Sequence, residues 1–596
     1  MASAGSTIVR CRAGHFVPLY SLIMFLPFSA VSKGFIGWCI ALAISSVILV
    51  SCGHKEPADL IVYNGVVYTV DGSFSTAQAF AVQGGRILAV GKTDDIKAKY
   101  EAAEMVDAQG KAVYPGFIDA HAHFVGYGRS LFEVDLYGCK DWAEAISRVR
   151  AFDKAHPGDT WIRGRGWDQN KFPDKAYPTN KQLNELFPKR PVLLQRVDGH
   201  AAIANNKALQ LAGVGAATTL TGGKIEVAGD VPTGLLIDNA VDLVTAVVPP
   251  ATREQYAQWL SKAQENCFGV GLTTIADCGL PYRDIAIIDT LQREGKLQMQ
   301  LYVLLSDDTV TYKQYMAARA AALAAGDPEV TRRYVGNGPY KTEKLFVKGV
   351  KAYADGALGS RGACLLHHYT DKPGWGGFLL SSPAHYDSLA QQLVGSDFQL
   401  CTHAIGDSGN RMALNVYSKY LGSNNDRRWR IEHAQVVSPD DFHLFGASSI
   451  IPSVQPTHAT SDMYWAGDRV GPERIKSAYA YKQLLEQNGW LPLGTDFPVE
   501  DISPIKTFYA AVARMDAKGF PDGGFQKENA LTREQALRGI TIWAARGCFL
   551  DKEVGSIEAG KRADFVILDK DLMNAPEKEL LGAKVNGTYM GGKKVR

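Results

Sequence analysis

The stretch FIDAHAHF, residues 117–124, places two histidines one residue apart at the end of an apolar run. The run AVYPGFIDA that leads into it holds Pro115 and Gly116, which is typical of a short strand entered through a turn. Side chains two residues apart on a strand point the same way, so the imidazoles of His121 and His123 would project together. That geometry suits metal chelation. By itself, however, a His-x-His pair also fits two polar residues that close a strand.

Length and composition describe a globular chain with a sizeable core. The 596 residues are 46% hydrophobic and 21% charged, and they are long for one domain. A formal net charge of +2, with no run of Lys or Arg, excludes a nucleic-acid-binding footprint. Nine cysteines without C-x-x-C spacing predict neither a zinc ribbon nor a disulfide framework. The sequence does not indicate an oligomeric state.

The first 51 residues are expected to be a signal segment. Residues 34–50, GFIGWCIALAISSVILV, carry no charge and follow Lys33. They run into LVSCG, in which small residues precede Cys52, and this resembles the lipobox of bacterial lipoproteins. The alternative is an uncleaved single-pass membrane anchor, because 17 apolar residues are close to the lower limit for spanning.

The lipobox resemblance implies a lipid on Cys52, a linker over residues 52–58 and a bacterial cell-envelope location facing the periplasm. Gly53, where inner-membrane lipoproteins carry Asp, favours the outer membrane by the same resemblance. The residues before Met24 look like neither signal nor domain, which makes Met24 an alternative start.

Both ends of the mature chain have the pattern of short strands joined by turns. Residues 59–113 contain Asn-Gly and Gly-Gly between alternating apolar residues, and residues 553–596 repeat this style. We therefore expect one small β-sandwich domain assembled from both ends.

The middle, residues 114–552, alternates strand-like and helix-like stretches. The candidate strands are residues 113–117, 273–278, 299–305, 345–355, 399–403, 429–433, 450–455 and 491–496. Eight strands that alternate with helices predict an α/β fold of the (β/α)8 TIM barrel type. The gap after the first strand is too long for one crossover, so an inserted subdomain is expected at about residues 130–250.

Polar side chains stand at the carboxyl ends of these strands, where barrel enzymes carry their chemistry. They are His121 and His123, Lys351 with Asp355, His403, His433 and Asp496. Each alone has an ordinary structural explanation, such as a hydrogen-bonded core histidine or an aspartate that caps a helix. Their coincidence at one end of one barrel indicates a metal site.

The order of motifs is similar to that of the amidohydrolase superfamily, within it amidohydrolase family 3 and its N-substituted formamide deformylase-like branch. The matching motifs are YPGFIDAHAHF, GVKAYADGALGSRGA, CTHAIGDSGN, RIEHAQVV and LPLGTDFPVE, with lesser matches in VDGHAAIANNKAL and SVQPTHATSDM. The resemblance runs from about residue 58 to the C-terminus. It implies two divalent metal ions: His121, His123 and Asp496 on one, His403 and His433 on the other, and a bridging carboxylated lysine on the fourth strand.

Three lysines lie near that fourth strand. Lys351 shares its face with Asp355, whereas Lys344 and Lys348 point the other way. The family motif also places the lysine four residues before Asp-Gly, at Lys351. A carbamate formed from CO2 would be an anionic oxygen ligand, whereas a free ammonium would be repelled by the cations. The alternative is a lysine that pairs with Asp355 over a single metal ion.

The expected reaction follows from these ligands. Histidine and carboxylate donors suit zinc, with iron, manganese or cobalt as alternatives. A metal-activated hydroxide would attack an amide-like, non-peptide C–N bond of a small molecule such as an N-acyl or N-formyl amine. Asp496 would carry the proton to the leaving amine.

Four further residues are expected to contact the substrate: His200 in the insertion, Gln455 and His458 after the seventh strand, and Trp167. Trp167 and the adjacent Asp168 are expected to close a lid. A plain loop histidine explains His200 equally well, and a tryptophan in an insertion is more often a packing residue.

Two other readings use the same scaffold. A lipid-anchored binding protein without catalysis predicts the loss of a ligand or of the eighth-strand acid, and none is missing. An isomerase, or a hydrolase of other bonds, would keep the same ligands, because the fold does not fix the reaction.

Overall fold

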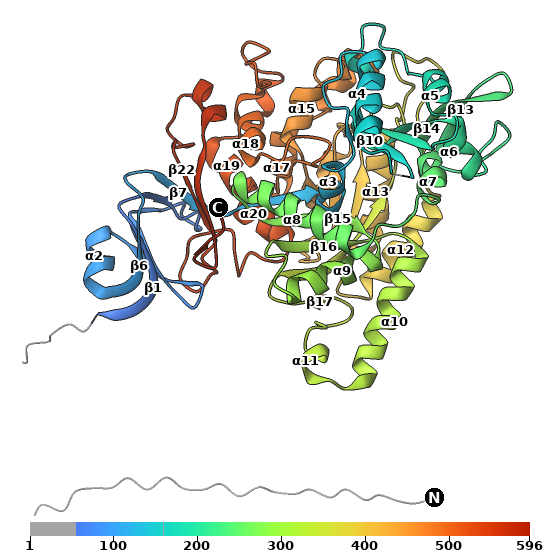
Figure 1. Ribbon diagram of the computed structural model, residues 1–596. Coiled ribbons are helices and arrows are strands. Elements are labelled where there is room, and N and C mark those ends of the chain that lie inside the picture. Colours follow the sequence, from blue (N-terminus) through green and yellow to red (C-terminus); the bar gives the residue numbers. More distant parts are fainter. Residues whose placement is uncertain (1–54, 159) are drawn as a thin grey trace, which may run out of the picture. The chain divides into compact units, whose positions relative to one another are not determined.

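Seven parallel strands form the central sheet of the structure, a computed structural model that describes residues 55–596 apart from residue 159 (Figure 1). They are β8 (Phe117–Ala122), β15 (Leu272–Leu280), β16 (Gln300–Ser306), β18 (Leu345–Tyr353), β19 (Gln399–Ala404), β20 (Arg430–His433) and β21 (Ile451–Ser453). Their spatial order follows the chain, as expected for successive βα units. The crossover helices include α9 (Tyr282–Arg293), α10 (Thr309–Ala325), α12 (Pro383–Val394), α13 (Asp407–Tyr420) and α17 (Tyr481–Asn488).

The eighth position of the barrel is filled without a regular strand. Leu493 forms a parallel bridge with Val454 after β21, and its carbonyl oxygen accepts the N–H of Ala120 in β8 at 3.2 Å. Further along, Asp496 N–H donates to the carbonyl oxygen of His121 at 2.8 Å. These bonds close the barrel between β21 and β8, and they bring Asp496 directly beside the histidines.

The first barrel strand begins later in the sequence than the predicted residues 113–117. Residues 112–115 form β7 (Ala112–Pro115), which pairs with β2 (Val66–Tyr68) and β22 (Phe565–Leu568) of another sheet. The barrel strand β8 begins only at Phe117. Gly116 is the crossing point: a Cβ there would lie 2.4 Å from Oγ1 of Thr273, so only glycine lets the chain pass.

Two sheets built from both ends of the described chain pack face to face, and their strands are drawn in blue and dark red in Figure 1. One contains β1 (Glu56–Tyr63), β4 (Ala79–Gln83), β5 (Arg86–Gly91) and β6 (Tyr100–Asp107). The other contains β2 (Val66–Tyr68), β3 (Thr76–Ala77), β7, β22 (Phe565–Leu568), β23 (Val585–Met590) and β24 (Lys593–Lys594). Phe80 and Phe565 meet edge to face between them, with ring centroids 5.0 Å apart.

The insertion between β8 and β15 contains a sheet of its own. Its strands are β9 (Val134–Asp135), β10 (Ile162–Trp167), β11 (Val192–Arg196), β12 (Ala201–Ala204), β13 (Gly223–Ala228) and β14 (Val231–Asp238), and α4 (Trp142–Ala155) packs on β9 and β10. The predicted fold class, a parallel barrel with an inserted subdomain and a β-sandwich from both ends, is therefore confirmed.

The predicted signal segment, including Met24 and Cys52, lies outside the described residues. Within residues 55–596, residue 159 aside, no helix combines the length and apolarity that crossing a bilayer requires.

Candidate metal centre

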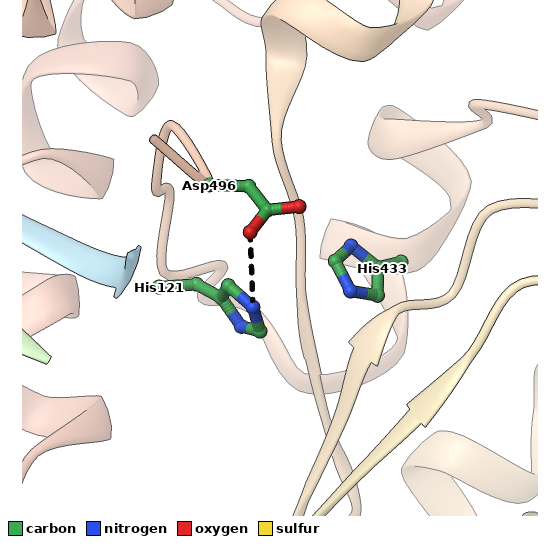
Figure 2. Close-up of side chains that lie close together, drawn as sticks. All are labelled: His121, His433 and Asp496. Carbon is green, nitrogen blue, oxygen red and sulfur yellow. Dashed lines mark ion pairs between the residues drawn. The ribbon is translucent and has the colours of Figure 1, made fainter. Parts of the chain in front are cut away.

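Three side chains from three strand ends converge on one point of the barrel. His121 on β8, His433 on β20 and Asp496 after the eighth segment each offer one ligand atom, and these atoms lie within 4.8 Å of one another (Figure 2). Oδ1 of Asp496 lies 3.5 Å from Nε2 of His121 and 3.2 Å from Nε2 of His123. The His-x-His pair of the barrel's first strand thus faces the aspartate of its last.

His121 is held in one orientation by a buried carboxylate. Its Nδ1–H donates to Oε2 of Glu432 at 2.7 Å, and Glu432 pairs with Nε of Arg430 at 2.8 Å. Burial alone would raise the pKa of Glu432, but the Arg430 guanidinium and His121 hold it well below its ordinary range. Because Nδ1 carries the proton, Nε2 of His121 is unprotonated, as metal-ligating histidines require.

Glu432 was not among the predicted site residues. The signal for it lies in RIEH, residues 430–433, where an arginine and a glutamate share one face of a strand that is buried at every position. Buried charges two residues apart are expected to be paired, and here the pair supports a ligand.

His433 is oriented in the same way by Gln455, whose Oε1 accepts its Nδ1–H at 2.7 Å. Gln455 is therefore placed behind His433 and is not on the cavity wall. Its amide oxygen is engaged by the imidazole, and its contact with substrate stays a prediction.

His403 extends the cluster toward the insertion. Its ring centroid lies 4.6 Å from that of His433 and 4.9 Å from that of His200, while His433 lies 4.8 Å from His121. Burial, reinforced by neighbouring positive charge, lowers the pKa of both His403 and His433 well below the ordinary value. The imidazoles are therefore neutral near pH 7, which is the form that binds a metal.

Lys351 is fully buried at this centre, with Nζ 3.2 Å from Nε2 of His121. Lys348 points out of the barrel, donates to the carbonyl oxygen of Asp397 at 2.6 Å and lies over the Phe549 ring. Among the described residues Lys351 forms no ion pair within 4.0 Å. Asp355 instead accepts backbone N–H groups of Cys364, Ile405 and Gly406, so the alternative of a Lys351–Asp355 pair is not observed.

The donor atoms fit a divalent cation. Oδ1 of Asp496 and Nε2 of His458 are buried without a hydrogen-bond partner in the described part of the chain. Burial alone would raise the pKa of Asp496, but His123, His121 and His433 lower it well below its usual range, so the carboxylate is ionised. Neutral imidazoles around an ionised, unsatisfied carboxylate are the ligand set that zinc and similar ions prefer.

A cavity of about 660 Å³ opens over these groups. Its wall contains His403, His433 and Asp496, and also His200 and His458. Nδ1 of His200 lies 2.6 Å from Oδ1 of Asp238, a buried carboxylate that the sequence reasoning missed.

Trp167 does not line this cavity, and its contact with substrate stays a prediction. Its indole N–H donates to the carbonyl oxygen of Leu194 at 2.8 Å, and its ring packs edge-on against Trp142 in the core of the insertion. Asp168 does line the cavity, but Arg196 neutralises it.

Comparisons with known proteins agree with this geometry. Residues 104–596 match the model of the amidohydrolase family, and residues 79–100 match the imidazolonepropionase-like composite domain of bacteria. The chain is 34% identical to the protein LONG AFTER FAR-RED 3 of Arabidopsis thaliana, over 90% of this chain and 91% of that protein. It is 29% identical to the N-substituted formamide deformylase of Arthrobacter pascens, over 90% of this chain and 97% of that enzyme.

Among solved structures, an uncharacterized metal-dependent hydrolase from Pyrococcus horikoshii OT3 superposes with a TM-score of 0.69 at 28% identity. The match covers 87% of this chain and 99% of that one.

Proposed function

We propose that this chain cleaves an N-acyl or N-formyl amine. It belongs to the amidohydrolase family and is a metal-dependent hydrolase of C–N bonds other than peptide bonds. The observation that carries the proposal is the convergence of His121, His433 and the ionised Asp496 under the cavity. The full-length similarity to a formamide deformylase supports the same bond type. The substrate is a small molecule.

The ligand assignment is part of this proposal. His121, His123 and Asp496 would hold one ion, and His403 with His433 would hold a second, zinc in both places. The short distances between Asp496 and the first two imidazoles, and between the His403 and His433 rings, support this division. The predicted carbamate on Lys351 would bridge the ions. Its support is a buried ammonium that faces an imidazole and has no described carboxylate partner, a costly arrangement unless the charge is removed.

When bound, such ions supply Lewis acidity toward the carbonyl oxygen and lower the pKa of water toward ~7. Asp496 is placed to take the proton of the attacking water and give it to the leaving amine, because it lines the cavity and its Oδ1 accepts no hydrogen bond from the described residues. His200, fixed by Asp238, and His458, 3.7 Å from Asp496, would contact the substrate from the cavity wall.

Localisation is proposed from the sequence alone. The lipobox-like residues that end at Cys52 support a lipid anchor in a bacterial cell envelope, with the outer membrane favoured by Gly53. A single-pass anchor formed by residues 34–50 is the alternative.

The test combines elemental analysis of the purified protein with a hydrolysis screen of N-formyl and N-acyl amines. We expect more than one equivalent of bound divalent metal, and release of free amine that stops when a chelator removes the metal. Full metal occupancy without hydrolysis of any such amide would favour an isomerase or another hydrolase on this scaffold.

A further inference from the structure

Arg165 is a charged side chain on the cavity wall that the proposed reaction does not use. It lies on β10 in the insertion and lines the same cavity as His200 and Asp496. Its Nη2–H donates to the carbonyl oxygen of Val197 at 3.0 Å, whereas its Nε–H is buried without a partner. No carboxylate of the described residues lies within 4.0 Å of its guanidinium. Arg165 therefore brings an uncompensated positive charge to the substrate cavity.

The neighbouring arginines of the insertion sheet are paired. Arg163, two residues earlier on β10, contacts Glu133 at 3.2 Å, and Arg196 on β11 pairs with Asp168 and Asp198. Asp135 lies beside Arg165 in the pairing of β9 with β10. However, its Oδ1 accepts the backbone N–H of Tyr137 at 2.9 Å.

The backbone around Arg165 is built to hold it in place. The pairing of β10 with β11 shifts register between Arg165 and Trp167, and such bulges re-aim side chains beside active sites. At the bulge, Gly166 has φ +119°, and a Cβ there would lie 2.6 Å from the backbone N of Tyr137. Gly199, with φ +79°, leaves the space that the guanidinium occupies, because a Cβ there would lie 3.2 Å from Nη2 of Arg165. Both positions require glycine.

Several acids of the cavity wall are engaged by other groups or only partly ionised. The wall's acids that already pair with bases are Glu133, Asp168, Asp198 and Asp501. Burial raises the pKa of Asp462 to about 7, which weakens its negative charge at neutral pH, and burial also raises the pKa of Glu500. Arg165 lines the same cavity as His403, His433 and Asp496, so its guanidinium shares the space over the metal centre.

We propose that Arg165 binds a carboxylate of the substrate, so that the enzyme prefers amides that carry a carboxylate over neutral amides of the same shape. The proposal rests on the proposed function and narrows its substrate class. A guanidinium is the side chain best matched to a carboxylate, since its planar N–H groups can donate in parallel. The carboxylate could belong to the amine product, as in an N-acyl amino acid, or to the acid product, as in the monoamide of a dicarboxylic acid.

Matched pairs of amides test this in the purified full-length enzyme. The amine-side pair is N-acetylphenylalanine and N-acetylphenethylamine, and the acyl-side pair is N-phenethylsuccinamic acid and N-phenethylbutanamide. We expect wild type to favour the carboxylate member of one pair in kcat/KM. In Arg165→Met that preference should fall roughly 10- to 100-fold, the loss typical of one hydrogen bond to a charged group. Arg165→Lys should keep part of it, because the charge remains without the planar fork.

Arg150→Gln is the control, since Arg150 is exposed on α4 and its removal changes net charge without touching the cavity. This variant should keep the wild-type preference. A second measurement, calorimetric binding of each amide to metal-free protein, separates this proposal from the proposed function. If the carboxylate member binds to wild type and not to Arg165→Met, the proposal is supported even if no amide is hydrolysed. Equal preference in wild type and Arg165→Met, or no preference for a carboxylate in either assay, would overturn it.

Discussion

Oε2 of Glu432 lies 2.7 Å from Nδ1 of His121, and this bond decides which nitrogen of His121 faces Asp496. The glutamate does not reach the cavity, yet it sets the tautomer of a proposed ligand. We therefore expect Glu432→Gln to lower metal affinity about 10- to 100-fold, because the amide can present its N–H₂ to the ring and no longer fixes the proton. Titration of the apoprotein with zinc measures this.

Glu432→Gln also removes the negative charge that pairs with the buried Arg430 guanidinium. Breaking a buried pair costs about 3–5 kcal/mol, so the unfolding midpoint should also fall. The control is Glu473→Gln, which removes an exposed glutamate paired with Lys476 and should change neither quantity. Unchanged zinc affinity in Glu432→Gln would show that His121 does not depend on this carboxylate, or is not a ligand.

The strand-end residues could be predicted because a parallel barrel brings every strand's carboxyl end to one rim. That rule placed His121, His403, His433 and Asp496 together without any knowledge of loops. Residues whose position depends on side-chain packing could not be predicted in this way. Gln455 sits behind an imidazole, and Trp167 fills the core of the insertion, because of contacts between segments far apart in the sequence. The pairing of Asp238 with His200 is likewise set by the docking of β14 beside β12.

The proposed ligands on different ions should be separable by metal content. His121→Ala is expected to lose the ion shared with Asp496, and His403→Ala the other, since each removes a nitrogen donor that backbone or water replaces poorly. Elemental analysis of each variant, with activity on the same preparation, is the measurement. Full metal retention in both variants together with loss of activity would contradict the ligand assignment.

Asp496→Asn should separate proton transfer from metal binding. The amide keeps the size of the carboxylate and offers one oxygen, but it cannot take a proton at neutral pH. We expect most of the metal to remain and kcat to fall on the order of 10²- to 10⁴-fold. Asp440→Asn, at an exposed position, is the control. Near-normal turnover would move the proton-transfer role to another residue, and His458, 3.7 Å from Asp496, would be the next candidate.

The lipid anchor can be tested by removing the thiol of Cys52. If Cys52 is the lipidation site, Cys52→Ala should accumulate as unprocessed precursor and take up no labelled fatty acid. Ser51→Ala, next to it, should be processed normally. Normal cleavage of Cys52→Ala with unchanged membrane association would rule out lipidation, and it would leave the single-pass anchor as the explanation for residues 34–50.

Lys351 carries the most specific expectation, because the proposed carbamate would supply two anionic oxygens between two cations. Lys351→Ala should lose the second ion and nearly all activity. The side chain lies fully buried beside His121, so its removal leaves a space in which acetate or propionate could replace the carbamate. Added acid should therefore restore part of both the metal content and the rate.

Two further variants make the lysine experiment decisive. Lys351→Arg should stay inactive with or without acid, since the guanidinium remains charged and fills the space. Lys348→Ala should retain metal and activity, because that side chain leaves the barrel on the opposite face and bonds to the carbonyl oxygen of Asp397. If acid restores neither metal nor rate in Lys351→Ala, the lysine does not act as a carboxylate bridge. If Lys348→Ala is the inactive variant, the bridging residue lies on the other face of β18.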